Sequence, residues 1–171
     1  MPLAYAFKNA AEAARLAPNA LEREFSLAIA RFTGGPYSHV EAWIWGPITQ
    51  AVCYSAREPR GTSIEVLDLS NTALWTIVQV VTTREEDQQL LGYAKGGQGR
   101  PYDAFGILGI GSDSNLHVEW DRFCSEECFA MGRDVVSGLK GVFLPAIPRW
   151  KVAPSGLVRG GFGMFELLKS V

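Results

Sequence analysis

Residues 123–131 read Phe-Cys-Ser-Glu-Glu-Cys-Phe-Ala-Met, a run with the pattern of the first turns of a helix. Its two glutamates fall in the first turn, where the positive end of the helix dipole favours acidic side chains. The N–H groups at a helix start also stabilise a thiolate, which makes Cys124 a candidate nucleophile. Cys128, one turn further along, and Cys53, within an apolar segment, have the pattern of buried structural thiols.

A histidine that could activate Cys124 comes earlier in the chain. His39 opens a predicted strand directly after the loop sequence Gly-Gly-Pro-Tyr-Ser, and from there a side chain can project into a cleft. A neutral imidazole takes the proton of a thiol and later returns it to a leaving group. Without His39, Cys124 would be interpreted as a structural residue. His117, in a polar segment, is expected at the surface.

Glu41 is a candidate for the group that orients the imidazole. It follows His39 by two residues, so the two side chains share one face of the strand, about 7 Å apart along it. An exposed carboxylate at a sheet edge is an equally good interpretation. Counting back from a turn at Gly46-Pro47 places Tyr54 or a neighbour opposite His39, but a tyrosine is not a usual third member of a Cys–His site. Both alternatives therefore stay open.

The other sequence patterns predict an α+β domain with an antiparallel sheet. Thr83 and Glu86 have the spacing of a capping box at the start of a helix. The predicted elements are a helix over Leu21–Phe32, a hairpin of His39–Trp45 and Ala51–Ala56 that begins the sheet, strands at Ser63–Leu67 and Trp75–Thr82, and a helix over Arg84–Lys95. No repeat or linker divides the chain, so residues 1–171 are expected to form one domain. Its core covers about 25–160, and a C-terminal tail covers about 147–171.

Composition excludes several classes of protein. The chain has 171 residues, with 16 Lys and Arg against 18 Asp and Glu, so its net charge of −2 argues against a nucleic-acid partner. Three cysteines are too few for a disulfide framework. The first residues lack the apolar stretch of a signal peptide, and no apolar run approaches the roughly 20 residues of a transmembrane helix.

Metal and nucleotide sites find little support in the sequence. Cys124, Cys128, His39 and His117 could supply four zinc ligands, but they lack the compact spacing of structural zinc sites. No dinucleotide or P-loop fingerprint is present in the sequence. No metal or organic cofactor is therefore expected.

The order of the landmarks is more specific than any one of them. It runs Tyr37-Ser38-His39-Val40-Glu41, Gly99-Arg100-Pro101-Tyr102-Asp103, Gly106-Ile107-Leu108-Gly109, Phe123-Cys124-Ser125-Glu126 and Ala153-Pro154-Ser155-Gly156-Leu157. This order resembles the circularly permuted NlpC/P60-like branch of the papain-like cysteine hydrolases, in which the histidine strand precedes the cysteine helix. A looser likeness is to small hydrolase-like proteins of phage and prophage gene sets. The chain departs from the family in having no acidic, amide or histidine side chain around Tyr54.

The resemblance implies a papain-like fold in which the helix that begins at Cys124 packs against an antiparallel sheet. It implies that Cys124 is the nucleophile and His39 the base, while Tyr102-Asp103 and Pro154–Leu157 are architectural. We then expect a cysteine peptidase or amidase that forms an acyl-enzyme on a peptide or peptidoglycan stem peptide. Glu41 or a group near Tyr54 would orient the imidazole, and the Tyr37 hydroxyl would assist the oxyanion.

Two other functions stay open. One is a non-catalytic binding module, such as a virion or tail component, which the missing conventional third residue favours. The other is a thioester or lipid acyl hydrolase or acyltransferase, because fold-level analogy does not select the substrate. The expected location is the cytoplasm or a phage virion, with association to a virion or the cell wall.

Overall fold

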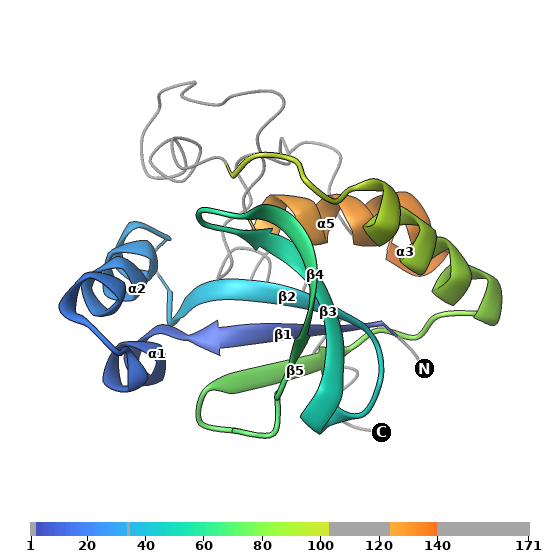
Figure 1. Ribbon diagram of the computed structural model, residues 1–171. Coiled ribbons are helices and arrows are strands. Elements are labelled where there is room, and N and C mark those ends of the chain that lie inside the picture. The colour runs from blue at the N-terminus through green and yellow to red at the C-terminus, as the bar shows by residue number, and fades with distance from the viewer. Residues whose placement is uncertain (1–2, 34, 103–123, 140–171) are drawn as a thin grey trace.

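The computed structural model describes residues 3–33, 35–102 and 124–139, and this part of the chain is an α+β fold on a five-stranded antiparallel sheet (Figure 1). The strands are β1 (Ala4–Asn9), β2 (Tyr37–Trp45), β3 (Ala51–Arg57), β4 (Gly61–Leu67) and β5 (Trp75–Gln79), in the spatial order β4-β3-β2-β1-β5. The helices are α1 (Ala10–Leu16), α2 (Ala20–Thr33), α3 (Arg84–Gly96) and α5 (Cys124–Val135), with 3-10 turns η1 (Ile48–Gln50) and η2 (Ser137–Leu139).

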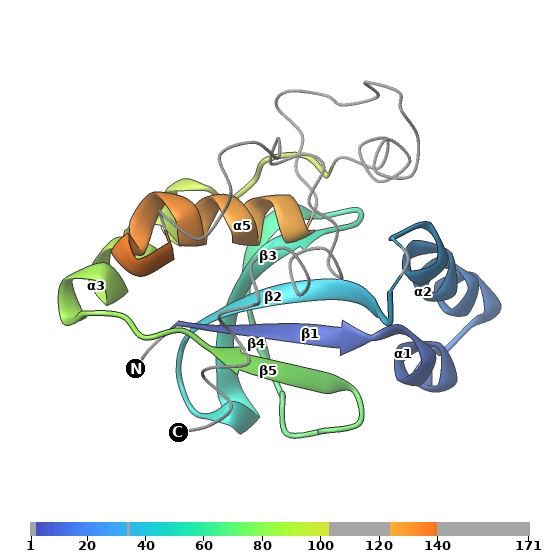
Figure 2. The same ribbon diagram turned by 180° about the vertical axis from the view of Figure 1, so that it is seen from behind.

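Two pairs of helices pack against the sheet. Helices α5 and α3 lie side by side, and α5 packs on β2 and β3 (Figures 1 and 2). Helices α1 and α2 pack on each other beside the start of β2. The main core lies under α5, where Val40 and Ala42 of β2 meet Cys128 and Phe129 of the helix. This packing brings the first residue of α5 toward the first residues of β2.

Most of the elements predicted after residue 20 are confirmed. Helix α2, the β2–β3 hairpin, β4 and α3 lie where the periodicities place them, and only β5 is shorter, ending at Gln79 rather than Thr82. The capping box is confirmed as well. The Thr83 hydroxyl accepts the N–H of Glu86 at 3.2 Å, and the Glu86 carboxylate accepts the N–H of Thr83 at 2.8 Å.

The prediction that the hairpin begins the sheet is wrong, because β1 precedes it and forms the strand between β2 and β5. Residues Ala4 to Phe7 are all buried. A strand that is buried on both faces has an apolar run instead of the alternation that reveals a half-exposed strand. The N-terminal strand therefore lacks the alternating pattern from which a strand is predicted.

The predicted register of the hairpin is also wrong. Tyr54 pairs with Ala42 rather than lying opposite His39. The connection is longer than a two-residue turn, because η1 follows Gly46, and a register irregularity lies between Trp43 and Trp45. Gly46 begins this connection with a φ of 88°, a conformation that glycine adopts without steric cost. Continued along the strands, the observed register places Arg57 opposite His39.

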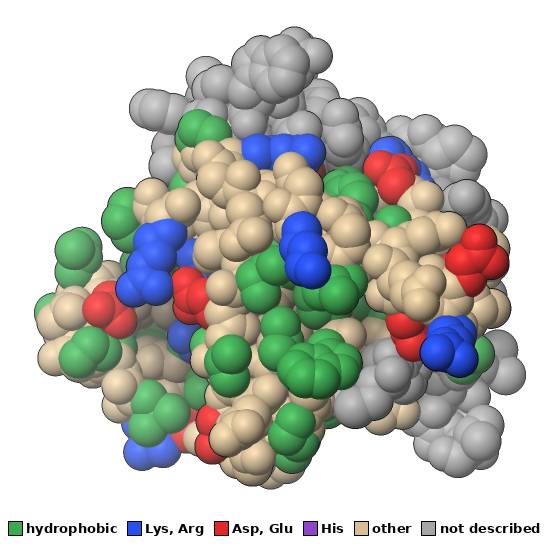
Figure 3. All heavy atoms as spheres, turned by 45° about the vertical axis from the view of Figure 1, so that its right-hand side comes forward, with side chains coloured by type: hydrophobic (Ala, Val, Ile, Leu, Met, Phe, Trp, Pro, Cys, Tyr) green, Lys and Arg blue, Asp and Glu red, His purple; other side chains and the backbone are tan. Residues whose placement is uncertain are grey.

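The surface carries a row of exposed apolar side chains at the far end of β2. Val52 pairs with Trp45 on one neighbouring strand and with Val66 on the other, and Trp45 and Val66 are 66% and 65% exposed. Figure 3 shows hydrophobic side chains gathered in the middle of one face, with acidic and basic side chains scattered around them.

Within residues 3–33, 35–102 and 124–139, no helix is both long and apolar enough to cross a membrane.

Several predicted features lie outside the described residues. They are His117, Asp103, Gly106–Gly109, Phe123, the tail over about 147–171 and the landmark Ala153–Leu157. The residues that carry the proposed chemistry, His39, Glu41 and Cys124, lie within the described part.

Candidate active site

His39 and Glu41 form a direct pair on β2. The Nε2 atom of the imidazole lies 2.7 Å from Oε1 of the carboxylate. The His39 side chain is 19% exposed and that of Glu41 only 2%, so the pair reaches from the edge of the site into the protein interior. A buried carboxylate in contact with a ring nitrogen fixes the orientation of the imidazole, which is the task expected of the third residue in a Cys–His site.

Cys124, the first residue of α5, is the second group that acts on His39. Its charge and side-chain hydrogen bonding are among the causes that raise the pKa of the imidazole. Because Nε2 is engaged by Glu41, Nδ1 is the ring nitrogen that remains for the thiol. The structure thus brings together three of the residues singled out from the sequence, in the order thiol, imidazole and carboxylate.

The electrostatic surroundings favour the protonated imidazole. Burial by itself lowers the pKa of His39, but the charges of Cys124 and Glu41 and hydrogen bonds to both side chains outweigh it and raise the pKa from 6.5 to about 9. At neutral pH His39 is therefore an imidazolium. In cysteine enzymes a cationic ring beside the nucleophile is one of the features that favour attack by sulfur.

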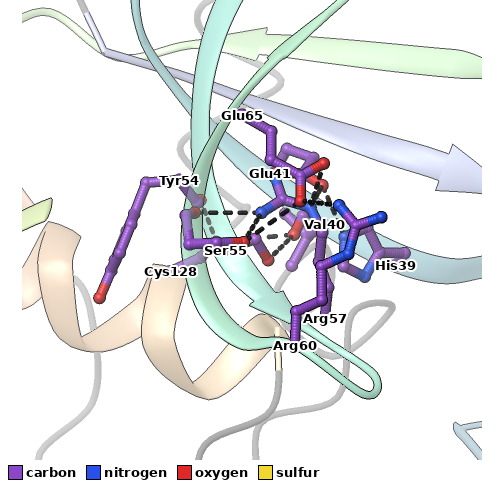
Figure 4. A network of polar contacts seen from close by, with 10 residues as sticks. His39, Val40, Glu41, Tyr54, Ser55, Arg57, Arg60, Glu65 and Cys128 are labelled. Atoms are coloured by element: carbon purple, nitrogen blue, oxygen red, sulfur yellow. Dashed lines mark hydrogen bonds and ion pairs between the residues drawn. The ribbon is translucent and has the colours of Figure 1, made fainter. Parts of the chain in front are cut away.

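Arg57 of β3 holds the far side of the Glu41 carboxylate (Figure 4). Its Nε donates to Glu41 Oε1 at 3.0 Å, and Nη2 donates to Glu41 Oε2. A third nitrogen, Nη1, donates to the carbonyl and hydroxyl oxygens of Ser63 at 3.0 and 2.8 Å. Sequence reasoning missed Arg57, and the corrected hairpin register is the signal that would have placed it beside His39.

The two candidate tyrosines occupy other positions. The Tyr54 hydroxyl donates to Glu127 of α5 at 2.6 Å, within the main core. Burial and then the adjacent Glu127 carboxylate raise the pKa of Tyr54. The contact that orients the His39 imidazole, expected from a group near Tyr54, is made by Glu41. Tyr37 is half-buried, and its ring packs against Phe7 with 5.4 Å between ring centroids. Its assistance to the oxyanion stays a prediction.

The other two cysteines are fully buried thiols. Burial raises the pKa of both Cys53 and Cys128. The Cys128 thiol donates to the backbone carbonyls of Val40 and Tyr54, at 3.7 and 3.8 Å. All three cysteines are free. Cys124 is buried as well, at 3% exposure, and differs from Cys53 and Cys128 in being one of the groups that raise the pKa of His39.

A cavity of about 560 Å³ lies beside the pair of His39 and Glu41. One wall is α2, whose Leu21 and Phe25 are 81% and 45% exposed. Charged residues from the sheet and its loops form much of the rest, with Lys8, Arg57, Glu58 and Glu65. The volume suits a small molecule or a few residues of a peptide, and the lining offers both apolar and ionic contacts.

The alternative of a zinc site involves the same residues. Cys124 and His39 are in contact, whereas Cys128 donates to backbone carbonyls in the core and His117 is outside the described residues. In the described part of the chain, no three His, Cys, Asp or Glu side chains are grouped to hold a metal ion.

Comparison with known proteins identifies few that are similar to this chain. No family model and no curated protein matches the chain. A solved structure that aligns with it is the crystal structure of the metalloprotein yiiX from Escherichia coli O157:H7, labelled DUF1105, with a TM-score of 0.48 and 19% sequence identity. The alignment covers 79% of this chain and 66% of the yiiX chain.

Proposed function

We propose that the protein is a cysteine hydrolase of the permuted NlpC/P60 type, with a papain-like fold. Cys124 is the nucleophile, His39 is the general acid and base, and Glu41 orients the imidazole. The observation that carries the proposal is His39 itself, whose Nε2 lies 2.7 Å from a buried carboxylate and whose pKa is raised in part by Cys124 at the start of a helix. This is the arrangement that nucleophilic catalysis by cysteine requires.

The reaction proceeds through an acyl-enzyme. The Cys124 thiolate attacks the carbonyl carbon of an amide, and N–H groups at the start of α5, with the Tyr37 hydroxyl, stabilise the oxyanion. The His39 imidazolium gives its proton to the departing amine, which leaves a thioester on Cys124. The neutral imidazole then takes a proton from water, and the resulting hydroxide attacks the thioester. Collapse of this second intermediate releases the carboxylic acid and the Cys124 thiolate, and His39 is again protonated.

The contact between His39 and Glu41 weakens the case for a non-catalytic binding module. The main argument for such a module is the missing third residue near Tyr54. Glu41 supplies a carboxylate 2.7 Å from His39 Nε2, from the same strand rather than from the neighbouring one. A protein that only binds has no need for an imidazole held between a thiol and a buried carboxylate.

The proposed substrate is an amide in a peptide or a peptidoglycan stem peptide. The mixed lining of the cavity, with Leu21 and Phe25 on one wall and Lys8 and Glu58 elsewhere, supports a substrate that has both apolar and charged groups. Thioesters and lipid esters are the second class to be tested, since the same acyl-enzyme chemistry cleaves them.

The first experiment measures thiol alkylation by iodoacetamide as a function of pH. We expect one cysteine to react rapidly below about pH 7, whereas an ordinary thiol titrates near pH 8.5. Cys124→Ala and His39→Ala should each remove this fast phase, and the matched control Cys53→Ala should keep it. A fast phase that survives Cys124→Ala, or no fast phase in the unaltered protein, would overturn the assignment.

The second experiment identifies the bond. The protein is incubated with isolated peptidoglycan, synthetic stem peptides and acyl thioesters, and new amine or thiol groups are detected by mass spectrometry. Release of amines by the unaltered protein and not by Cys124→Ala supports an amide hydrolase. Cleavage of thioesters alone would move the protein to the second substrate class. No turnover of any acyl compound, despite a reactive Cys124, would contradict the hydrolase.

A further inference from the structure

Arg57 lies beside Glu41, where its charge acts on the candidate site through the carboxylate. Its side chain is 14% exposed, and it binds both oxygens of Glu41 as well as Ser63 on the next strand. In Figure 4 the guanidinium, the carboxylate and the imidazole follow one another across β3 and β2. This two-pronged contact is specific to arginine, because a lysine has one charged nitrogen and cannot present a planar fork.

The burial of Glu41 requires such a partner. A carboxylate that is 2% exposed has lost most of its hydration, and the resulting penalty is offset only by paired charges and hydrogen bonds. His39 provides one contact, to Oε1. Arg57 contacts both oxygens, so it fixes the rotation of the carboxylate as well as its charge. The orientation of Oε1 toward the imidazole thus depends on the guanidinium behind it.

Other charged and titratable groups face this unit from each neighbouring element. Lys8 of β1 pairs with His39 across the strands, and Glu65 of β4 lies 3.7 Å from Arg57 Nε. Among the described residues this set is Lys8 of β1, Glu22 of α2, Cys53 of β3, Glu58 and Arg60 of the β3–β4 connection, Glu65 of β4, and Cys124 and Cys128 of α5. Arg60 pairs with Glu65 at 2.9 Å, whereas Arg57 contacts Glu41 directly, as His39 does.

We infer that Arg57 is a positioning residue of the active site, which holds the Glu41 carboxylate toward His39 and so influences the pH range in which Cys124 is reactive. This inference rests on the proposed function. The thiolate, imidazolium, carboxylate and guanidinium sum to zero charge. Removal of the guanidinium leaves one net negative charge in a half-buried site, and a negative site holds its protons more tightly. The pH profile of Cys124 alkylation has a rising limb at low pH and a falling limb at high pH. Both limbs should then move to higher pH.

The test is the alkylation profile of Cys124 between pH 4 and pH 11 in Arg57→Met and Arg57→Lys. We expect Arg57→Met to move both limbs upward by about one pH unit, the lower end of what an adjacent opposite charge does. Arg57→Lys keeps the positive charge but loses the planar guanidinium that contacts both carboxylate oxygens. Its limbs should stay at the original pH values, while its rate falls about tenfold because the imidazole is less well oriented.

The matched control is Arg60→Met, which removes an arginine from the connection that follows Arg57. Arg60 is 71% exposed and binds Glu65 rather than Glu41, so its profile should coincide with that of the unaltered protein. Equal limb shifts in Arg60→Met and Arg57→Met would overturn the inference, as would a lower rate in Arg57→Met without any shift. If Arg57→Met does not fold, an Arg57→Lys protein with unaltered rate and limbs would overturn it too. Loss of the fast phase in the unaltered protein would instead overturn the hydrolase itself.

Discussion

His39 Nε2 and Glu41 Oε1 lie 2.7 Å apart although both side chains come from one strand, so a two-residue spacing joins a ring to its orienting carboxylate. Residues i and i+2 share one face of a strand and are separated by about 7 Å of backbone. The glutamate side chain is long enough to close that distance. The short sequence His-Val-Glu therefore contains the imidazole together with its orienting partner, and only the thiol comes from a distant part of the chain.

The raised pKa of His39 is the first prediction. NMR titration of the two histidine rings should show one with a pKa of about 9, assigned to His39 by its absence from His39→Gln. Glu41→Gln should lower this pKa, because one of the negative charges that favours the imidazolium is removed. His117→Gln serves as the control and should leave the titration of His39 unchanged. A value below 6.5 for His39 would contradict the described site.

The same shift predicts how stability depends on pH. Because the folded protein holds the His39 proton more tightly than the unfolded chain, this contribution is complete below about pH 6.5 and is lost as the pH rises through about 9. The free energy of unfolding, measured by urea denaturation, should fall across this window by on the order of 3 kcal/mol. In His39→Gln the decline should be smaller. An equal decline in that variant would assign it to other groups.

A double-mutant cycle should reveal the coupling of Glu41 and Arg57. Glu41→Gln leaves a buried guanidinium without its anion and should lower the free energy of unfolding by about 3 kcal/mol. Arg57→Met leaves a buried carboxylate and should cost a similar amount. The double variant should lose clearly less than the sum of the two, because no charge is left unpaired. Additive losses would mean that the two side chains act independently.

Glu86 connects the start of α3 to η2, which follows α5, and this predicts an acid-sensitive link. Its carboxylate accepts the hydroxyl and N–H of Ser137 at 2.6 and 2.7 Å, and these bonds, together with the N–H of Thr83, lower the pKa of Glu86 to about 2. The stabilisation is complete above about pH 4.5 and is lost as the pH falls toward 2. Glu86→Gln should lower the free energy of unfolding at pH 7 by about 1–2 kcal/mol. The exposed neighbour Glu85 gives the control Glu85→Gln, which should change little.

Two adjacent glycines should respond differently to alanine. A Cβ at Gly97 would overlap the Tyr54 hydroxyl, which donates to Glu127, whereas a Cβ at Gly96 meets nothing within 4 Å. We expect Gly97→Ala to lower the free energy of unfolding by about 1–3 kcal/mol through overpacking. Gly96→Ala, inside α3, should be neutral or stabilising by up to about 1 kcal/mol. Equal effects in urea denaturation would show that Tyr54 moves without cost.

Local sequence patterns predicted the helices and strands that are determined by neighbouring residues. The stripe of α2, the capping box of α3 and the alternation of β2 each depend on residues within a few positions, so their existence could be inferred. The contact between Tyr54 and Glu127 joins residues 73 apart in sequence, and no local pattern reports it. A single error in loop length, from η1, moved the expected partner of His39 from Arg57 to Tyr54. The pair of His39 and Glu41 could be foreseen as a candidate because strand alternation alone puts both side chains on one face.

The position of β1 in the sheet has a consequence for synthesis of the protein. Of the described strands β1 is translated first, yet its two hydrogen-bonding edges belong to β2 and to β5, which ends at Gln79. On the ribosome, β1 therefore has one open edge from the time β2 has emerged until β5 follows. Such an edge is a site for pairing with other chains. Deletion of Ala4–Asn9 would leave β5 without its only sheet neighbour among the described strands. The attachment of β5 to the sheet therefore depends on β1.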